Sequence, residues 1–197
     1  MAIRLIAKCT RPDLAVMARA VRMLSLLAVL FTSPSLYAET DLEYRVKAAF
    51  LYNFTKFVDW PPRSFAAANA PLQLCVYGSY PFGPDLEKIV SGKSVDNRAL
   101  QVRRVKQLAD TQGCQVIYFG DSEGVRLAAH LQHLQSQAVL TISDDPRFLE
   151  LGGMVRFLLV NNKVRFEINR SIAERTGLSI SSKLLRVAHA VHDDAAR

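Results

Sequence analysis

The stretch Ala49–Pro62, AFLYNFTKFVDWPP, is dense in aromatic residues and stops at a pair of prolines. Upstream of it, Thr40 and Glu43 fit the capping box, in which a hydroxyl residue is followed three positions later by Glu. The sequence therefore predicts a helix that begins at Thr40, runs to about Asp59 and is ended by the prolines. Such a helix can anchor a chain in a membrane, face a partner or build the core.

Helical periodicity separates the side chains of this segment into two faces. At 100° per residue, one broad arc is apolar and the opposite one carries charge, which is typical of an amphipathic surface helix. We therefore expect the aromatic arc to pack into the domain's own core, with Phe50 and Phe57 as core residues, and keep a partner-binding groove as the alternative. The predicted core arc contains Tyr44, Val46, Phe50, Leu51, Phe54, Phe57 and Val58, and the opposite face Arg45, Ala49, Tyr52, Lys56 and Asp59.

The N-terminal segment has the order of a secretory signal peptide: basic residues, then the apolar run 23–31, then a small-residue exit at Ala38. The apolar run is shorter than the roughly 20 residues that span a bilayer. We expect a signal peptide over 1–38, cleaved between Ala38 and Glu39, and a single domain over 39–197 in the periplasm. An uncleaved anchor is the alternative, and Met17 is an alternative start.

Charge and cysteine content narrow the classes of function. Removal of 1–38 takes away five basic residues and one acid, so the formal net charge of +7 falls to +3. The charge balance thus gives no argument for nucleic-acid binding. Of three cysteines, Cys9 lies in the predicted signal, and Cys75 and Cys114 remain. An even count in an exported chain indicates a disulfide, and the absence of a CxxC pair argues against redox or zinc motifs.

Short apolar runs alternate with helical patterns through the rest of the chain. This rhythm predicts an α/β fold, with a mostly parallel sheet and helices on both faces. Expected strands are 72–77, 100–105, 115–119 and 138–142, and expected helices are 82–90 and 123–135.

The C-terminal third has a different pattern. Strands 154–160 and 164–168 flank Asn161-Asn162-Lys163, which predicts an antiparallel hairpin at the edge of the sheet. Asn169 is expected to cap a short helix ended by Gly177, and Ser181 or Ser182 to cap a last helix through Val191.

Two stretches resemble phosphate-binding motifs, but each lacks a required glycine. In SGKS, at 91–94, the first glycine of a phosphate loop would have to stand at position 87, which is occupied by Glu87. GSYPFG, at 78–83, has Tyr80 in place of the middle glycine of a dinucleotide loop.

Carboxylates follow two of the expected strands. Asp121, Asp144 and Asp145 lie where carboxyl ends of parallel strands can hold Mg²⁺ or a phosphoryl group. Each also stands directly before a helical pattern, so capping of free backbone N–H groups is the favoured interpretation.

Other candidate sites are weak. Two histidine pairs at i,i+3 spacing, on polar helix faces or at a helix end, lack a third ligand, and no nucleophile–base arrangement occurs, so we predict no metal, no cofactor and no catalytic residues. Basic side chains in the C-terminal third are mainly expected to be solvated, with a pocket for a small anionic ligand as the minority interpretation. The histidines are His130, His133, His189 and His192; the basic residues are Arg165, Arg170, Arg175, Lys183 and Arg186, of which Arg170, Arg175 and Lys183 are the candidate ligand-binding set.

Several stretches together resemble the YfiR family of small periplasmic proteins, from about Tyr44 to Val191. The carriers are YRVKAAFLYNFTKFVDWP, LCVYGSYPFG, ISDDPRF, GGMVRF and VRFEINRSIAERTGLSISSKLLRVA. The resemblance implies an α/β sheet flanked by helices. It also implies a non-enzymatic regulator that binds the periplasmic sensor domain of an inner-membrane signalling protein, a diguanylate cyclase or a histidine kinase. Repression of a cyclase would lower cyclic-di-GMP and biofilm formation.

The resemblance also has limits. A second cysteine pair found in the family has no counterpart here, so a redox switch resting on it does not carry over. A homodimer and a small anionic ligand stay open. The alternative function is a periplasmic small-molecule binder, or an enzyme that uses the carboxyl ends of the strands.

Overall fold

The computed structural model describes residues 35–120 and 126–193. The chain divides into two compact units, Met1–Glu39 and Thr40–Arg197. Helix α2 covers Ser35–Phe57, so the predicted start at Thr40 is wrong and the helix begins five residues earlier. None of the helices in the described ranges is long and apolar enough to cross a membrane.

Helix α2 also ends earlier than expected. Val58–Asp59 leave the helix and form strand β1, which pairs antiparallel with β9 (Ser179–Ile180). The β-branched Val58 thereby reaches the core, where it is 3% exposed. A turn of 3₁₀ helix, η2 (Pro62–Ser64), follows.

The buried stripe of α2 is rotated from the predicted arc. Ala48, Leu51 and Phe54 are fully buried, whereas Phe50 and Phe57 are half-buried and Val46 is 37% exposed. The stripe is set by where α2 meets the sheet: the Phe54 ring lies 5.8 Å from that of Phe157 and 5.0 Å from that of Phe166. The prediction that Phe50 and Phe57 are core residues is therefore confirmed only in part, because both pack against the core but are half-buried.

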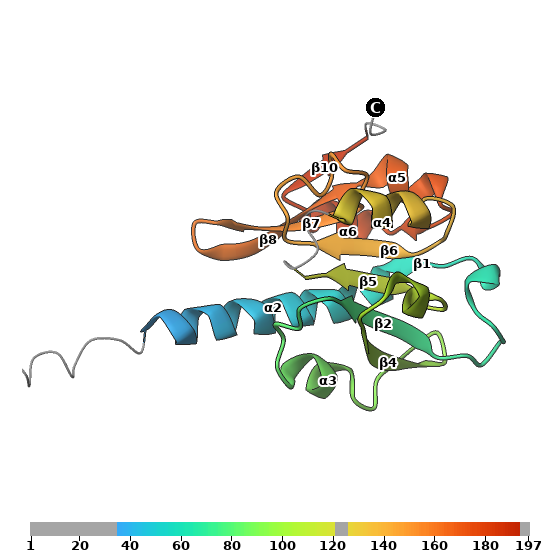
Figure 1. The fold of residues 1–197 in the computed structure, drawn as a ribbon, viewed down its shortest axis with the longest axis horizontal. Coiled ribbons are helices and arrows are strands. Elements are labelled where there is room, and N and C mark those ends of the chain that lie inside the picture. The colour runs from blue at the N-terminus through green and yellow to red at the C-terminus, as the bar shows by residue number, and fades with distance from the viewer. Residues whose placement is uncertain (1–34, 121–125, 194–197) are drawn as a thin grey trace, which may run out of the picture. The chain divides into compact units, whose positions relative to one another are not determined.

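The main sheet is mostly parallel and has the order β10-β8-β7-β6-β5-β2-β4-β3 (Figure 1). Antiparallel pairing occurs at β7–β8 and at β3–β4. The strands are β2 (Leu72–Tyr77), β3 (Ser94–Val95), β4 (Arg98–Val105), β5 (Val116–Phe119), β6 (Leu140–Ser143), β7 (Val155–Val160), β8 (Lys163–Asn169) and β10 (Ala190–His192). The remaining helices are α3 (Asp85–Val90), η3 (Leu108–Thr111), α4 (Leu127–Leu134), α5 (Arg170–Arg175) and α6 (Ser182–Val187).

The two faces of the sheet carry separate apolar cores, because successive strand residues point to opposite sides. One core joins the sheet to α2, α3, α5 and α6 and contains Val76 and Tyr118. The other lies under α4 and contains Tyr77 and Phe119. The predicted α/β class with helices on both faces is confirmed.

The predicted C-terminal hairpin is confirmed, but it does not form the edge of the sheet. Asn161 and Asn162 both have positive φ, as the two-residue turn requires. The expected last helix stops at Val187, and residues 190–192 instead add as β10, parallel to β8. A second hairpin, β3–β4, turns at Asp96-Asn97 in the same way and was not predicted.

Caps at the C-terminal helices follow the sequence. The Asn169 side chain accepts a hydrogen bond from the Ile172 N–H at the start of α5, and Gly177 has a φ of +88° just after its end. Ser181, rather than Ser182, caps α6 by accepting from the Lys183 N–H.

Candidate functional site

A pocket lies at the carboxyl end of β6, between α2 and the β7 strand. Its volume is about 380 Å³. In α/β sheets, ligands commonly bind beyond the carboxyl ends of the strands, so this is the position at which a site is expected. We call it the strand-end pocket; it is lined by Glu43, Lys47, Asp144, Pro146, Arg156, Phe157, Leu158 and Leu159.

Lys47 is the central charge of the strand-end pocket. It lies on the buried stripe of α2, and only 4% of its side chain is exposed. Its ammonium donates to Asp144 Oδ2 at 2.6 Å and also contacts the Glu43 carboxylate one turn earlier on the helix. It lies 4.5 Å from the centre of the Tyr44 ring, an added cation–π contact.

Asp144 is held by three donors from two elements of the chain, α2 and β5. Besides Lys47, its Oδ2 accepts from the Tyr118 hydroxyl at 3.0 Å and from the Tyr44 hydroxyl at 3.4 Å. The prediction that Asp144 caps a helix is wrong, because its carboxylate turns towards α2 and the end of β5. The tyrosines and Lys47 together satisfy the Oδ2 atom of a carboxylate that is only 17% exposed.

A second ion pair closes the other side of the pocket. The Arg156 guanidinium pairs with Glu167 across β7 and β8 at 2.7 Å and donates to the Pro146 carbonyl. His192 on β10 lies 3.5 Å from the same Glu167 oxygen. This chain of contacts ties β10, the hairpin and the loop after β6 together.

Asp145 organises the turn that follows β6. Its carboxylate accepts from the Arg147 backbone N–H at 2.8 Å, so it caps a turn rather than a helix. Hydrogen bonds from the Arg147 side chain lower the pKa of Asp145, with smaller contributions from the backbone bond and from charge attraction, against the opposing effect of burial.

Tyr80, in the GSYPFG turn, is fixed by its neighbours. The Arg104 guanidinium lies 3.6 Å from the centre of its ring and 2.7 Å from a Glu87 oxygen. Burial, reinforced by the hydrogen bond to Glu87, raises the pKa of Tyr80 above its ordinary value. Burial also acts to raise the pKa of Glu87, but hydrogen bonds from Tyr80 and Arg104 outweigh it and lower that pKa. The turn is thus a packed structural feature.

Three of the four histidines do not lie where the sequence placed them, whereas His133 is exposed on α4 as expected. His130 is buried rather than on a polar face, and its ring is 4.9 Å from that of Tyr77 and 6.2 Å from that of Phe119. His189 and His192 lie just before and within β10, not on a helix. Among the residues that the structure describes, no three His, Cys, Asp or Glu side chains are grouped to hold a metal. Asp121 lies outside the described residues.

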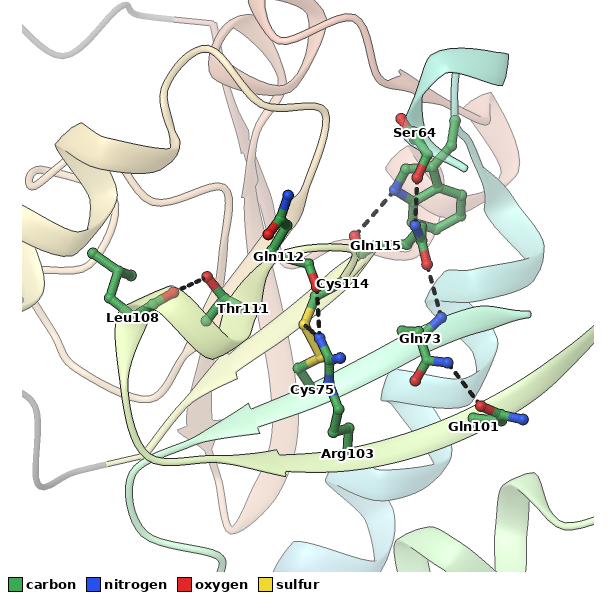
Figure 2. Close-up of a disulfide and its surroundings, with 11 residues drawn as sticks. Ser64, Gln73, Cys75, Gln101, Arg103, Leu108, Thr111, Gln112, Cys114 and Gln115 are labelled. Carbon is green, nitrogen blue, oxygen red and sulfur yellow. Dashed lines mark hydrogen bonds between the residues drawn. A yellow bond between two sulfur atoms is a disulfide. The ribbon is translucent and has the colours of Figure 1, made fainter. Parts of the chain in front are cut away.

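The predicted disulfide between Cys75 and Cys114 is present (Figure 2). β2 and β5 are neighbours in the sheet, which brings the two cysteines together, and both are buried. Figure 2 shows Arg103 reaching from β4 across the bond, where it donates to the Gln112 carbonyl at 2.8 Å and to Cys114 Sγ at 3.0 Å.

The basic residues predicted to bind an anion lie on α5 and α6. Arg170 pairs with Asp193 at 2.8 Å, while Arg175 and Lys183 are exposed. An anionic-ligand site formed by these three stays a prediction. Ala38 and Glu39, the expected cleavage position, fall within α2.

Sequence reasoning missed Lys47. The only local signal is a lysine next to Ala48 on the face that also carries Leu51. Its partner Asp144 is 97 residues away, so no local sequence pattern predicts the ion pair. The pocket's charges neutralise one another, and its rim of Leu158 and the 51% exposed Leu159 is apolar. Such an arrangement combines paired charges with an exposed apolar surface.

Comparisons with known proteins found a solved structure of low similarity and a matching family. The solved ABC domain in complex with L-Trp from Streptococcus pneumonia has a TM-score of 0.46 and 12% identity with this chain. The match covers 61% of this chain and 55% of that one, so the chain spans about half the length of that structure. A model of the YfiR/HmsC-like family matches residues 44–189, most of the chain, and the protein therefore belongs to the YfiR/HmsC-like family.

Proposed function

We propose that this protein binds the periplasmic sensor domain of an inner-membrane signalling protein and represses a diguanylate cyclase, which lowers cyclic-di-GMP. The family match supports the coarser part of this function, a periplasmic regulator of cyclic-di-GMP signalling, at the level of the family. A histidine kinase is the other candidate partner.

The main support for the proposal is that the charged side chains of the strand-end pocket are held in ion pairs. Lys47 is paired with Asp144 and Glu43, and Arg156 with Glu167. Ionised groups held in such pairs fix the shape of a surface, while the apolar rim beside them offers contact area. A regulator needs just such a stable surface.

The energetic demand on a repressor is modest. It must bind the inactive state of the sensor more tightly than the active state. A preference of about 100-fold corresponds to roughly 2.7 kcal/mol, which an interface of ordinary size can supply without chemistry.

We further propose that residues 1–38 are a signal peptide and that 39–197 form the exported domain. The Cys75–Cys114 disulfide supports an oxidising compartment. Sequencing of the N-terminus of protein recovered from the periplasm should begin at Glu39, and recovery of an intact N-terminus in membranes would favour the anchor.

Deletion of the gene tests the function directly. Cyclic-di-GMP should rise in the deletion strain and return to its former level on expression of the full chain. A chain lacking residues 1–38, which stays in the cytoplasm, is the matched control and should not restore it. An unchanged nucleotide level across several growth conditions would refute cyclase repression for this protein.

A second function is favoured by the pocket's volume. About 380 Å³ falls within the range of small-molecule sites, and Asp144 stands at the carboxyl end of a strand. A small ligand there would act on the same surface. Thermal-shift measurements of the purified domain with a metabolite library would reveal such a ligand. If no compound raises the melting temperature, the small-molecule function is refuted for that library.

A further inference from the structure

We propose that the outer edge of β7 at Phe157–Val160 is a docking edge, on which an extended segment of the partner protein adds as a further strand. This inference rests on the proposed function, because it identifies the surface through which the sensor would be held. It also makes the strand-end pocket the place where that segment's side chains enter.

The first observation is that β7 extends beyond the end of its neighbour β6. It pairs with β6 only at Val155 and Arg156, whereas its pairing with β8 continues to Val160. Figure 1 shows the hairpin extending past the end of β6. Over the described part of the chain, Phe157–Val160 therefore has a pairing strand on its β8 side alone.

The second observation is the direction of the backbone groups. Val160 and Lys163 flank a two-residue turn and form a hydrogen-bonded pair, and such pairs alternate along an antiparallel ladder. Leu158 therefore bonds to β8. Phe157 and Leu159 direct their N–H and C=O groups away from β8, towards the position that a continued β6 would occupy.

The third observation is that the two edges of the hairpin are protected differently. The β8 edge carries the exposed charges of Lys163 and Arg165, which discourage strand addition. Phe157-Leu158-Leu159-Val160 on β7 has no charge and no proline. Leu159 is 51% exposed.

The strand-end pocket supplies the chemistry of the occupant. It lies along β7 beyond the last β6 pair, with α2 as its other wall. The lining residues carry two acids and two bases, Glu43 and Asp144 against Lys47 and Arg156, so their formal charge sums to zero. An uncharged segment with apolar side chains at alternate positions fits this setting. In strand addition, main-chain bonds give affinity and pockets for alternate side chains give selectivity.

A pair of proline variants isolates the docking edge. Leu159→Pro removes an outward N–H from the β7 edge without removing a β7–β8 ladder bond. Val164→Pro is the matched control: Val164 lies directly opposite Leu159, and its N–H faces the other edge of the hairpin. Leu159→Ala tests the side chain alone. Circular dichroism and melting show whether the variants keep the fold.

The partner domain is obtained first and then titrated. In living cells, a photo-crosslinking residue replaces Leu159 in the exported chain, and a second version carries it at Leu42 on α2 for comparison. The crosslinked protein is then identified by mass spectrometry. Its purified periplasmic domain is titrated against the wild type and the three variants, and hydrogen exchange of residues 157–160 is followed in the complex.

We expect Leu159→Pro to weaken binding at least tenfold, Val164→Pro to leave it within twofold, and the Phe157 and Leu159 amides to become protected from exchange. Equal binding by folded Leu159→Pro would overturn the docking edge and leave the proposed function standing. Crosslinking only to a second copy of the chain also overturns it, in favour of a homodimer. If neither crosslinking position captures a membrane protein, both proposals fail together.

Discussion

Replacement of Lys47 by methionine should destabilise the domain strongly. Methionine has nearly the length and helix propensity of lysine, so the change mainly removes the charge. Asp144, which is 17% exposed, then loses its cation, with Glu43 left beside it. Breaking a buried ion pair costs about 3–5 kcal/mol. Because the Tyr118 hydroxyl still donates to Asp144 at 3.0 Å, we expect the lower end, about 3 kcal/mol.

Urea unfolding of the mature domain at pH 7 measures this loss. For an m-value of about 2 kcal/mol/M, the midpoint should fall by about 1.5 M. Lys56→Met is the matched control on the same helix, since Lys56 is exposed over the Tyr52 ring, and it should cost less than about 0.5 kcal/mol. Asp144→Asn added to Lys47→Met removes the uncompensated charge and should return part of the stability. Equal midpoints for the two lysine variants, or no recovery by Asp144→Asn, would refute the reasoning.

Three further predictions concern the core, the disulfide and the loop after β6. Phe54→Ala should cost about 3–5 kcal/mol, and Phe50→Ala clearly less, because Phe54 is fully buried and Phe50 is not; equal losses in thermal melts would contradict this. Loss of the Cys75–Cys114 bond, which closes a loop of 39 residues, should cost up to roughly 4 kcal/mol, and intact-mass measurement of the exported protein should show two hydrogens fewer than the reduced chain. Asp145→Asn should lower stability at pH 7 by less than about 1 kcal/mol, since its partner Arg147 is exposed. The folded-state pKa of Asp145 is lowered, so its contribution is present above the unfolded value of about 4 and fades as pH falls through the folded-state pKa; a difference from wild type that does not shrink as the pH of the urea titrations is lowered from 7 would argue against this assignment.

Local sequence signals predicted the parts of the fold that depend on local chemistry. Asn161-Asn162 fixed the hairpin because few residues tolerate two successive positive φ values. Asn169 and Gly177 bounded α5 for similar local reasons. Asp96-Asn97 is the same kind of turn sequence, but β3 is only two residues long. So short a strand has no alternating pattern from which the hairpin could be predicted.

Features that depend on distant partners could not be predicted in this way. The phase of the buried stripe on α2 is decided by Phe157 and Phe166, about a hundred residues later in the chain. Val191 completes an apolar pattern that reads as helix, yet the chain there pairs with β8. The burial of Lys47 required Asp144 in the same way. Periodicity shows that a face is buried, but the tertiary partner decides which residues lie at its centre.

The packing of α2 on the β7–β8 hairpin sets an order of events in folding. Phe50 and Phe54 stack on each other and pack against Phe157 and Phe166, so this part of the aromatic core is completed only when the last quarter of the chain is available. Closing so long a loop is entropically costly, and proteins dominated by such distant contacts fold slowly. A chain emerging from its N-terminus therefore exposes part of the apolar face of α2 until the β7–β8 hairpin has emerged, and a holding chaperone would find its binding site there.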